Sequence, residues 1–245
     1  GEVVASGNVV SIGDYAFRNC AKLGELDSGD KLVSVGNGAF ENCEALYRFE
    51  IPASVTTIGD GAFTNCTGII EVVNLSSLSS VKGSDDLGGL CKYAWDVLTS
   101  ADEPKKISNV DGFIIYDRDI PDEGDLLIKY VGTAKEVTIP DGIRAIYKAA
   151  FYANENITKV IVPESVDQIG AEAFRGCVNL KTVVLSDYLH SFSEYAFAGC
   201  TSLDEINIPS TVSNLLMGVF EGCESLESII LPSSIRGINE NAFYG

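Results

Sequence analysis

The sequence is almost without histidine, the side chain that most often serves in acid–base catalysis and metal binding. Its 245 residues include one histidine, one tryptophan and one methionine. The patterns of serine hydrolases, zinc proteases and phosphate-binding glycine loops are absent, as is any Cys-x-x-Cys pair. His190 and Cys91 could form a nucleophile pair, but no third group that would orient them can be identified. We therefore predict that the protein is not an enzyme, with no catalytic residues, no metal ligands and no cofactor.

Long apolar runs and an excess of positive charge are missing as well. The longest apolar runs are a few residues, whereas a helix that crosses a bilayer needs about 20. The 17 basic residues face 35 acidic ones, which gives a net charge of −18. This charge repels phosphate backbones and anionic lipid headgroups. The sequence therefore predicts no membrane span and no nucleic acid partner, and it leaves basic or neutral proteins and carbohydrates open as partners.

What the sequence does have is an internal repeat. A phenylalanine, usually preceded by alanine, recurs every 23 residues, and eight copies can be counted. The copies fall into two groups, which are Phe17, Phe40 and Phe63, and then Phe151, Phe174, Phe197, Phe220 and Phe243. A period of about 20 to 50 residues is typical of a stack in which each turn contacts only its neighbours. We therefore expect a solenoid without a single central core.

Each copy carries the same order of apolar and turn-forming residues. In the copy that begins at Leu180, apolar Val183 and Leu185 alternate with a residue that faces away, which predicts a short parallel strand. A proline follows at the same place in five copies, where its missing N–H would end the strand. These are Pro52, Pro140, Pro163, Pro209 and Pro232. We predict that a short helical turn precedes each phenylalanine, so that the fold class is an α/β solenoid.

Six of the seven cysteines follow the phenylalanine of their repeat by three residues, and only Cys91 lies outside this pattern. Equivalent residues of successive turns lie about 4.8 Å apart, a separation that a disulfide would permit. In the copy that contains Phe151, however, the same place is held by Asn154. Cysteine and asparagine are both small and can both bond nearby backbone groups. We therefore expect buried free thiols rather than disulfides.

The run I-P-x-x-V-x-x-I-G-x-x-A-F-x-x-C, from Ile51 to Cys66, closely resembles the BspA-like, Treponema pallidum-type leucine-rich repeat family of bacterial surface proteins. The resemblance covers about residues 9–66 and 134–243. It implies a leucine-rich repeat solenoid that is secreted or attached to the cell surface, and some family members are adhesins for host matrix proteins or other bacteria. The chain starts at Gly1 with no visible signal peptide, which we interpret as the trimmed start of a longer protein.

The middle of the chain departs from the repeat. Acidic residues after Ser84, followed by an apolar face, predict a helix. That face consists of Leu87, Leu90, Cys91, Ala94 and Leu98. The runs 112–116 and 126–130 predict two strands. We predict N-terminal repeats in residues 1–68, a bridge of helix and hairpin in residues 69–133, and C-terminal repeats in residues 134–245, all in one continuous solenoid domain.

The loop of residues 117–125 holds the densest group of carboxylates. Calcium prefers six to eight oxygen ligands, but the spacing does not match an EF-hand and Arg118 offsets part of the charge. Calcium binding by this loop stays open beside the simpler interpretation of a solvated hairpin loop. This loop, Trp95 and Cys91 would form the site under a third hypothesis, an enzyme with a deep pocket between bridge and repeats.

The outward positions of the strands in residues 134–245 provide a candidate binding surface. Equivalent places in the first repeats hold Asp27 and Glu50, so the outward face changes from charged to apolar along the chain. Solenoid faces and contiguous apolar patches are common docking surfaces, although β-branched residues suit strands without any ligand. The predicted ligand-binding residues are Thr138, Lys159, Ile161, Thr182, Val184, Glu205, Asn207 and Ile230.

These observations predict a non-catalytic protein- or glycan-binding module of an exported bacterial surface protein, with a role in adhesion or host interaction. Its partner would be a host or bacterial surface protein or glycan, and its oligomeric state is open. The alternative is a structural spacer that presents another domain of a longer protein. The two interpretations differ in whether the outward strand face has a ligand.

Overall fold

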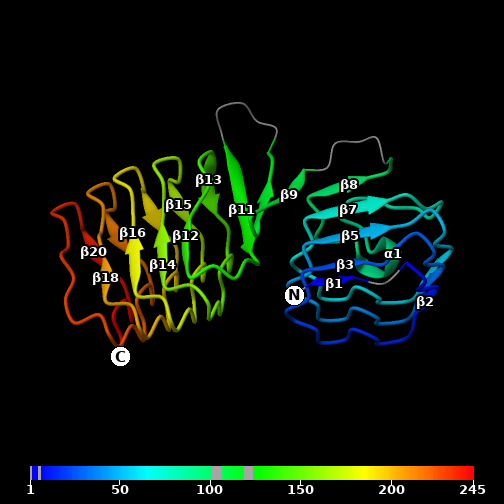
Figure 1. The fold of residues 1–245 in the computed structure, drawn as a ribbon, viewed down its shortest axis with the longest axis horizontal. Helices are drawn as coiled ribbons and strands as arrows, with labels where there is room; N and C mark the ends of the chain where they lie inside the picture. Colours follow the sequence, from blue (N-terminus) through cyan, green and yellow to red (C-terminus); the bar gives the residue numbers. More distant parts are fainter. Residues whose placement is uncertain (1, 5–6, 101–105, 119–123) are drawn as a thin grey trace. The chain divides into compact units, whose positions relative to one another are not determined.

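The computed structural model describes residues 2–4, 7–100, 106–118 and 124–245 (Figure 1). The chain divides into two compact units, residues 1–105 and residues 106–245, which we call unit 1 and unit 2. Across the described residues the repeats form a β-solenoid of about 9 turns with a period of about 23 residues. The division at residues 69 and 133, and the continuity of one solenoid domain, stay predictions.

Unit 1 is built on two parallel sheets, one on each side of the stacked turns. The first sheet contains β1 (Glu2–Val4), β3 (Glu25–Asp27), β5 (Arg48–Ile51), β7 (Glu71–Asn74) and β8 (Asp96–Leu98), in that order. The second contains β2 (Ser11–Ile12), β4 (Ser34–Val35) and β6 (Thr57–Ile58). Each strand pairs with the equivalent strand of the next turn, so that Glu25 lies beside Arg48 and Arg48 beside Glu71.

Unit 2 repeats this arrangement with an antiparallel start. One sheet has the order β17 (Ser191–Phe192), β15 (Gln168–Ile169), β13 (Ile143–Ile146), β11 (Asp125–Tyr130), β10 (Phe113–Tyr116) and β9 (Ile107–Val110). The opposite sheet contains β12 (Glu136–Thr138), β14 (Lys159–Ile161), β16 (Thr182–Val184) and β18 (Glu205–Ile206). A further pair is β19 (Asn214–Leu215) with β20 (Gly237–Ile238). The antiparallel pairing of β10 with β11 confirms the predicted hairpin.

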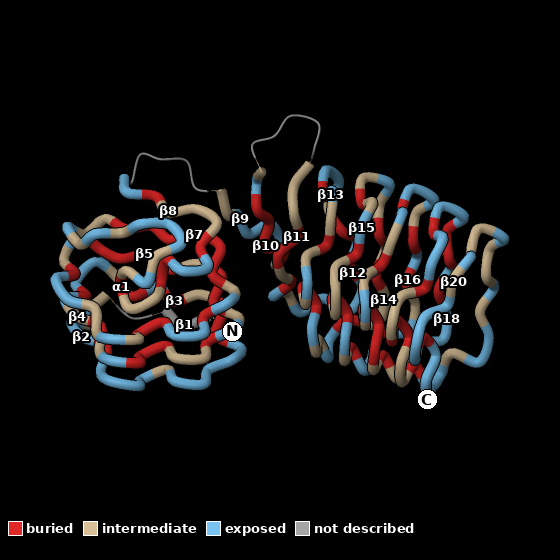
Figure 2. The backbone as a smooth tube through the Cα atoms, turned by 180° about the vertical axis from the view of Figure 1, so that it is seen from behind, coloured by how far each residue is buried: buried red, intermediate tan, exposed pale blue. Residues whose placement is uncertain are grey.

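Stacked aromatic rings form the core of each unit. In unit 1 the rings of Phe17, Phe40 and Phe63 stack with centroids 5.1 and 4.9 Å apart. In unit 2 the stack begins at Tyr130, which lies 5.2 Å from Phe151, and continues to Phe243. Figure 2 shows buried stretches alternating with exposed ones along each turn, as expected when every turn adds one layer to a shared interior. The predicted phenylalanine column is confirmed, as one column in each unit.

The predicted helical turn before each phenylalanine is wrong. Alternate backbone N–H groups of this segment donate across to the next turn, as from Tyr15 to the Asn37 carbonyl at 2.9 Å. The N–H groups between them donate to the carbonyl three residues earlier, as from Arg18 to Tyr15, and not four residues earlier as in an α-helix. Residues with positive φ interrupt each such segment, for example Tyr15 (58°) and Asn19 (63°), or Gly38 (56°) and Asn42 (63°). A left-handed residue every few positions is incompatible with an α-helix. The fold is therefore a β-solenoid, not an α/β one.

The predicted helix after Ser84 is also wrong in its extent. Only α1 (Asp86–Gly89) is helical, and Leu87 and Gly88 inside it have φ of 54° and 65°. Leu98, expected on the helical face, belongs to β8. Leu90, Cys91 and Ala94 are nevertheless buried, because the segment packs as an irregular turn on the stack. The apolar spacing therefore identified the buried side chains but not the backbone conformation.

The cysteines are free thiols, as expected. Five of the thiols each donate a hydrogen bond of 3.0–3.2 Å to the backbone carbonyl of the phenylalanine 26 residues earlier. These five are Cys43, Cys66, Cys177, Cys200 and Cys223. Asn154 instead accepts from the N–H groups of Asn156 and Ile157. Each of these thiols thus provides a hydrogen-bond donor for one backbone carbonyl of the preceding turn.

Candidate functional site

Three of the predicted site residues lie side by side on the outward face of the β12–β14–β16 sheet in unit 2. Thr138 pairs in register with Ile161, and Ile161 with Val184. The central residue of each strand points into the core while its neighbours are exposed or half-buried. Val184 is 42% exposed. Because in-register parallel strands are about 4.8 Å apart, these side chains form a continuous row.

A second row flanks the first on the same face. Lys159 lies beside Thr182, and Thr182 beside Glu205. The strand alternation places these side chains on the same side as Ile161 and Val184. Within the part of the chain that the structure describes, Lys159 has no ion pair within 4 Å. Glu136 lies beside Lys159 at the other end of this row. The face therefore combines β-branched side chains with one cation, Lys159, and two carboxylates, Glu136 and Glu205.

The structure does not extend the first row to Asn207 and Ile230 as strand partners. The paired part of β18 ends at Ile206. The amide of Asn207 accepts from the N–H of Leu185 and donates to its carbonyl, both at 2.8 Å, so it is occupied by the neighbouring turn. Ile230 lies outside any strand and is 90% exposed. The row of paired, outward residues thus consists of Thr138, Ile161 and Val184.

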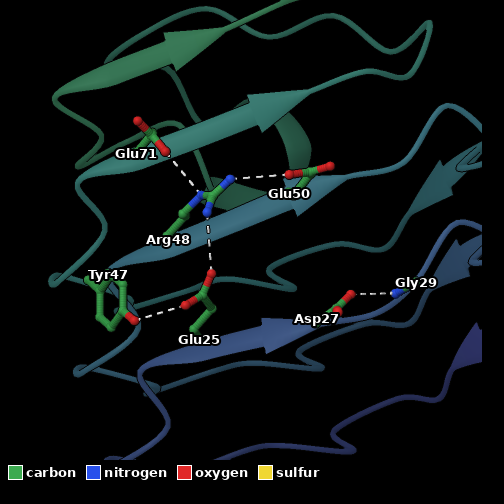
Figure 3. Close-up of polar contacts among 7 residues, drawn as sticks. All are labelled: Glu25, Asp27, Gly29, Tyr47, Arg48, Glu50 and Glu71. Atoms are coloured by element: carbon green, nitrogen blue, oxygen red, sulfur yellow. Dashed lines mark hydrogen bonds and ion pairs between the residues drawn. The ribbon is translucent and has the colours of Figure 1, made fainter. Parts of the chain in front are cut away.

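Unit 1 has a different outward face, centred on Arg48 (Figure 3). Its guanidinium lies between three carboxylates, at 3.4 Å from Glu25, 3.2 Å from Glu50 and 3.0 Å from Glu71. The hydroxyl of Tyr47 donates to Glu25 at 2.9 Å. Glu71 is fully buried, and its contact with Arg48 is a charge contact without aligned hydrogen-bond geometry. The face therefore joins three turns through one cation.

Sequence reasoning missed this cluster, although it noted the charged residues Asp27 and Glu50. The available signal was the spacing of 23 residues that places Glu25, Arg48 and Glu71 at one position of successive turns. In-register parallel pairing makes such residues direct neighbours. In Figure 3, Asp27 lies apart from the cluster and accepts from the N–H of Gly29 at 3.0 Å.

Cys91, the candidate nucleophile of the enzyme hypothesis, is not activated. Burial raises the pKa of the Cys91 thiol to about 11, which disfavours the thiolate that a nucleophile needs. Most of the acidic loop proposed for calcium, residues 119–123, lies outside the described residues. Within the described ranges there is no group of three or more His, Cys, Asp or Glu residues that could hold a metal ion.

The fold and the stacked phenylalanine columns define a leucine-rich repeat protein. The chain belongs to the family described as BspA type leucine rich repeat region, whose model matches residues 2–84 and 129–245 in 6 copies. The family consists of non-enzymatic repeat proteins, so this chain is a repeat module of the binding or scaffold kind. None of the helices in the described part of the chain is long and apolar enough to cross a membrane.

Two solved structures illustrate the relationship. The Treponema pallidum leucine-rich repeat protein is 31% identical over 56% of this chain and 66% of its own, with a TM-score of 0.52. A leucine-rich cell surface protein from Faecalibacterium prausnitzii is 22% identical over 98% of this chain and 59% of its own, with a TM-score of 0.44. This chain thus spans less than two thirds of either protein. No curated protein sequence matches the chain.

Proposed function

We propose that the chain is a non-catalytic binding module of an exported bacterial surface protein, and that the outward face of β12, β14 and β16 docks its partner. The observation that carries the proposal is the in-register row of Thr138, Ile161 and Val184. Single exposed apolar residues are common on protein surfaces, but a contiguous row is less so. The partner is a host or bacterial surface protein or glycan, and the role is adhesion or host interaction.

The composition of this face supports docking rather than a purely structural role. The β-branched side chains supply apolar area, while Lys159 and Glu205 at its flank supply charges that can orient a partner. Export of the protein is supported by membership of a family of bacterial surface proteins. Asn207 contributes less to binding because its amide already bonds the backbone of Leu185.

The test is direct binding of the purified chain to a panel of immobilised extracellular-matrix proteins and glycans. The variant I161D/V184D should reduce binding to the captured ligand at least about tenfold, since it places two desolvated charges in the interface. The matched control is Val178→Asp, because Val178 is 39% exposed and lies outside the row. Equal binding by wild type and I161D/V184D would reject this face, and a folded wild type that binds nothing in the panel would favour the spacer function.

A further inference from the structure

Unit 1 contains a pocket of about 320 Å³ between its third and fourth turns. One wall is formed by the segment from Ile58 to Asn65, and the other by residues between Asp85 and Tyr93. All lining residues belong to the described part of unit 1. The volume lies at the lower end of the range of about 300–1,000 Å³ for ligand pockets, which suits a small ligand.

The pocket exists because the repeat fails at this point. In the first turns the N–H of each repeat phenylalanine donates to an alanine carbonyl, from Phe17 to Ala39 and from Phe40 to Ala62, but Phe63 donates to Gly88. The next residue, Gly89, therefore stands where a phenylalanine would otherwise follow. Leu87 and Leu90 complete the interior at this point, so that Phe63 stays fully buried. A Cβ on Gly88 would lie 2.6 Å from the Gly59 carbonyl oxygen, so glycine is required for this approach.

Two backbone donors lose their partners at the pocket. In earlier turns the N–H of Gly38 donates to the Asp60 carbonyl at 3.1 Å, and the N–H of Asn42 donates to the Thr64 carbonyl at 2.9 Å. The equivalent N–H groups of the third turn are those of Gly61 and Asn65, and neither has an acceptor among the described residues. Because both residues line the pocket, a ligand oxygen could take the place of the missing carbonyls.

A ladder of asparagine side chains ends at the same place. The amide of Asn65 donates to Asn42 at 3.0 Å, and that of Asn42 donates to Asn19 at 2.7 Å. This direction leaves the Asn65 Oδ1 atom without a donor among the described residues. The next turn has no asparagine to continue the ladder, since Cys91 stands at the equivalent position.

A ladder from side chain to backbone ends there as well. The Asp14 carboxylate accepts the N–H of Asn37, and the Asn37 side chain accepts the N–H of Asp60. By the same geometry the Asp60 carboxylate would accept from the following turn, but no such donor is found among the described residues. The pocket therefore offers an uncompensated acceptor at Asp60 and another at Asn65.

The charges of the lining select the class of ligand. The Asp60 carboxylate disfavours phosphate and other anions. Lys92 is held by Asp85 at 2.9 Å, so its charge is already compensated. Since the pocket offers donors and acceptors together, it fits hydroxyl groups, which donate and accept at once. The exposed ring of Tyr93 adds an aromatic surface at the rim. We propose that this pocket binds one neutral sugar residue.

The proposal concerns unit 1 and does not depend on the docking face of unit 2. Its test is NMR titration of the full ¹⁵N-labelled chain with glucose, galactose, mannose and N-acetylglucosamine, each to 50 mM. The expected result is a saturable shift of the Gly61, Asn65 and Gly89 amide signals with at least one sugar. The variants Asp60→Ala and Asn65→Gly should each weaken that binding about five- to tenfold, the loss of one hydrogen bond.

The controls distinguish a sugar site from an anion site and from a general loss of structure. Asn19→Gly also removes one asparagine–asparagine bond and leaves the pocket intact, so it should bind like the wild type. Both exchanged asparagines have positive φ, which glycine tolerates. The Asp60 side chain makes no hydrogen bond or ion pair with the described residues, so Asp60→Ala should fold like the wild type. It therefore still tests the proposal if Asn65→Gly fails to fold. The proposal is overturned if no sugar shifts these amides, if Asp60→Ala binds as well as wild type, or if inorganic phosphate produces the same shifts.

Discussion

The outward faces of the two units differ although their strands, register and cores are alike. In unit 1 the face is a network in which Arg48 joins carboxylates of three turns. In unit 2 the row equivalent to Glu25, Arg48 and Glu71 holds Glu136, Lys159, Thr182 and Glu205, without such a network among the described residues. Two residues further along the strands, where unit 1 has Asp27 and Glu50, unit 2 has Thr138, Ile161 and Val184. Both units stack aromatic rings at about the same separation, such as 4.9 Å between Phe40 and Phe63 and 4.7 Å between Phe151 and Phe174. The repeat therefore specifies the interior, while the outward positions are free to diverge.

The difference also determines what each face can do. A buried carboxylate such as Glu71 requires its cation, so the unit 1 face is committed to internal contacts. The side chains of the unit 2 row face outward and are exposed or half-buried, so a partner can cover them and displace the water around them. We therefore expect substitutions on the unit 1 face to change stability, and substitutions on the unit 2 face to change binding.

The largest expected effect tests whether the interiors are equivalent. Phe40→Ala and Phe174→Ala should each lower the free energy of unfolding by about 3–5 kcal/mol, because both rings are fully buried and stacked on two neighbours. Urea unfolding of each variant, followed by circular dichroism, measures these costs. Phe243→Ala is the control, since that ring is 39% exposed and should cost clearly less. A cost near 1 kcal/mol in only one unit would show that the two cores are not alike.

The next effect concerns Arg48. Arg48→Ala should destabilise the chain by about 3 kcal/mol, because it removes the positive charge that lies 3.0 Å from the buried Glu71 carboxylate. Adding Glu71→Gln should recover much of that loss. Arg18→Ala removes the more exposed pair of Arg18 with Glu41 and should cost less than about 1 kcal/mol. If Arg48→Ala costs no more than Arg18→Ala in the same unfolding experiment, the network does not stabilise unit 1.

The buried thiols give a pH effect of intermediate size. Burial raises the pKa of Cys66 from 9.0 to about 12. The contribution of this thiol to stability is therefore fully present below pH 9 and is lost as the pH rises from 9 toward 12, because only the unfolded chain ionises. Over that window the loss is about 1.4 kcal/mol per pH unit for one thiol. Stability measured from pH 8 to 11 should fall less steeply in Cys66→Ser, which keeps a donor for the Phe40 carbonyl.

Cys20→Ser is the matched control for this experiment. Cys20 occupies the same repeat position but is exposed, so its replacement reports the effect of exchanging a thiol for a hydroxyl outside the core. A wild-type slope shared by Cys66→Ser would mean that the thiol at position 66 does not carry the effect. Tyrosine and lysine titrate in the same range, which is why the difference between variants, not the slope itself, is compared.

Features that depend on side-chain spacing could be predicted from the sequence. The phenylalanine columns, the free thiols and the β10–β11 hairpin followed from the period of 23 residues and from apolar alternation. The sequence did not reveal that the helical turn is absent. Tyr15, Ala149 and Glu172 adopt left-handed backbone conformations, and none of these residue types indicates such a conformation. The sequence showed only that Arg48 and Glu71 are 23 residues apart. It could not show that Glu71 is buried, because that burial depends on the neighbouring turns. The pocket arises where the repeat fails. A pocket between bridge and repeats was expected only under the enzyme hypothesis, and the repeat pattern gives no information about its lining.

The smallest expected effect on stability is that of a substitution in the outward row of unit 2, and it tests most directly whether this row is free of the core. Val184→Asp should change the free energy of unfolding by about 1 kcal/mol or less, since the side chain faces outward and only its strand preference is lost. Val183→Asp, one residue away, would bury a charge in the core and should cost several times more. The pair thus compares the two faces of one strand in the same unfolding assay. If Val184→Asp were as harmful as Val183→Asp, the outward row would be part of the packing of unit 2, and it could not serve as a free docking surface.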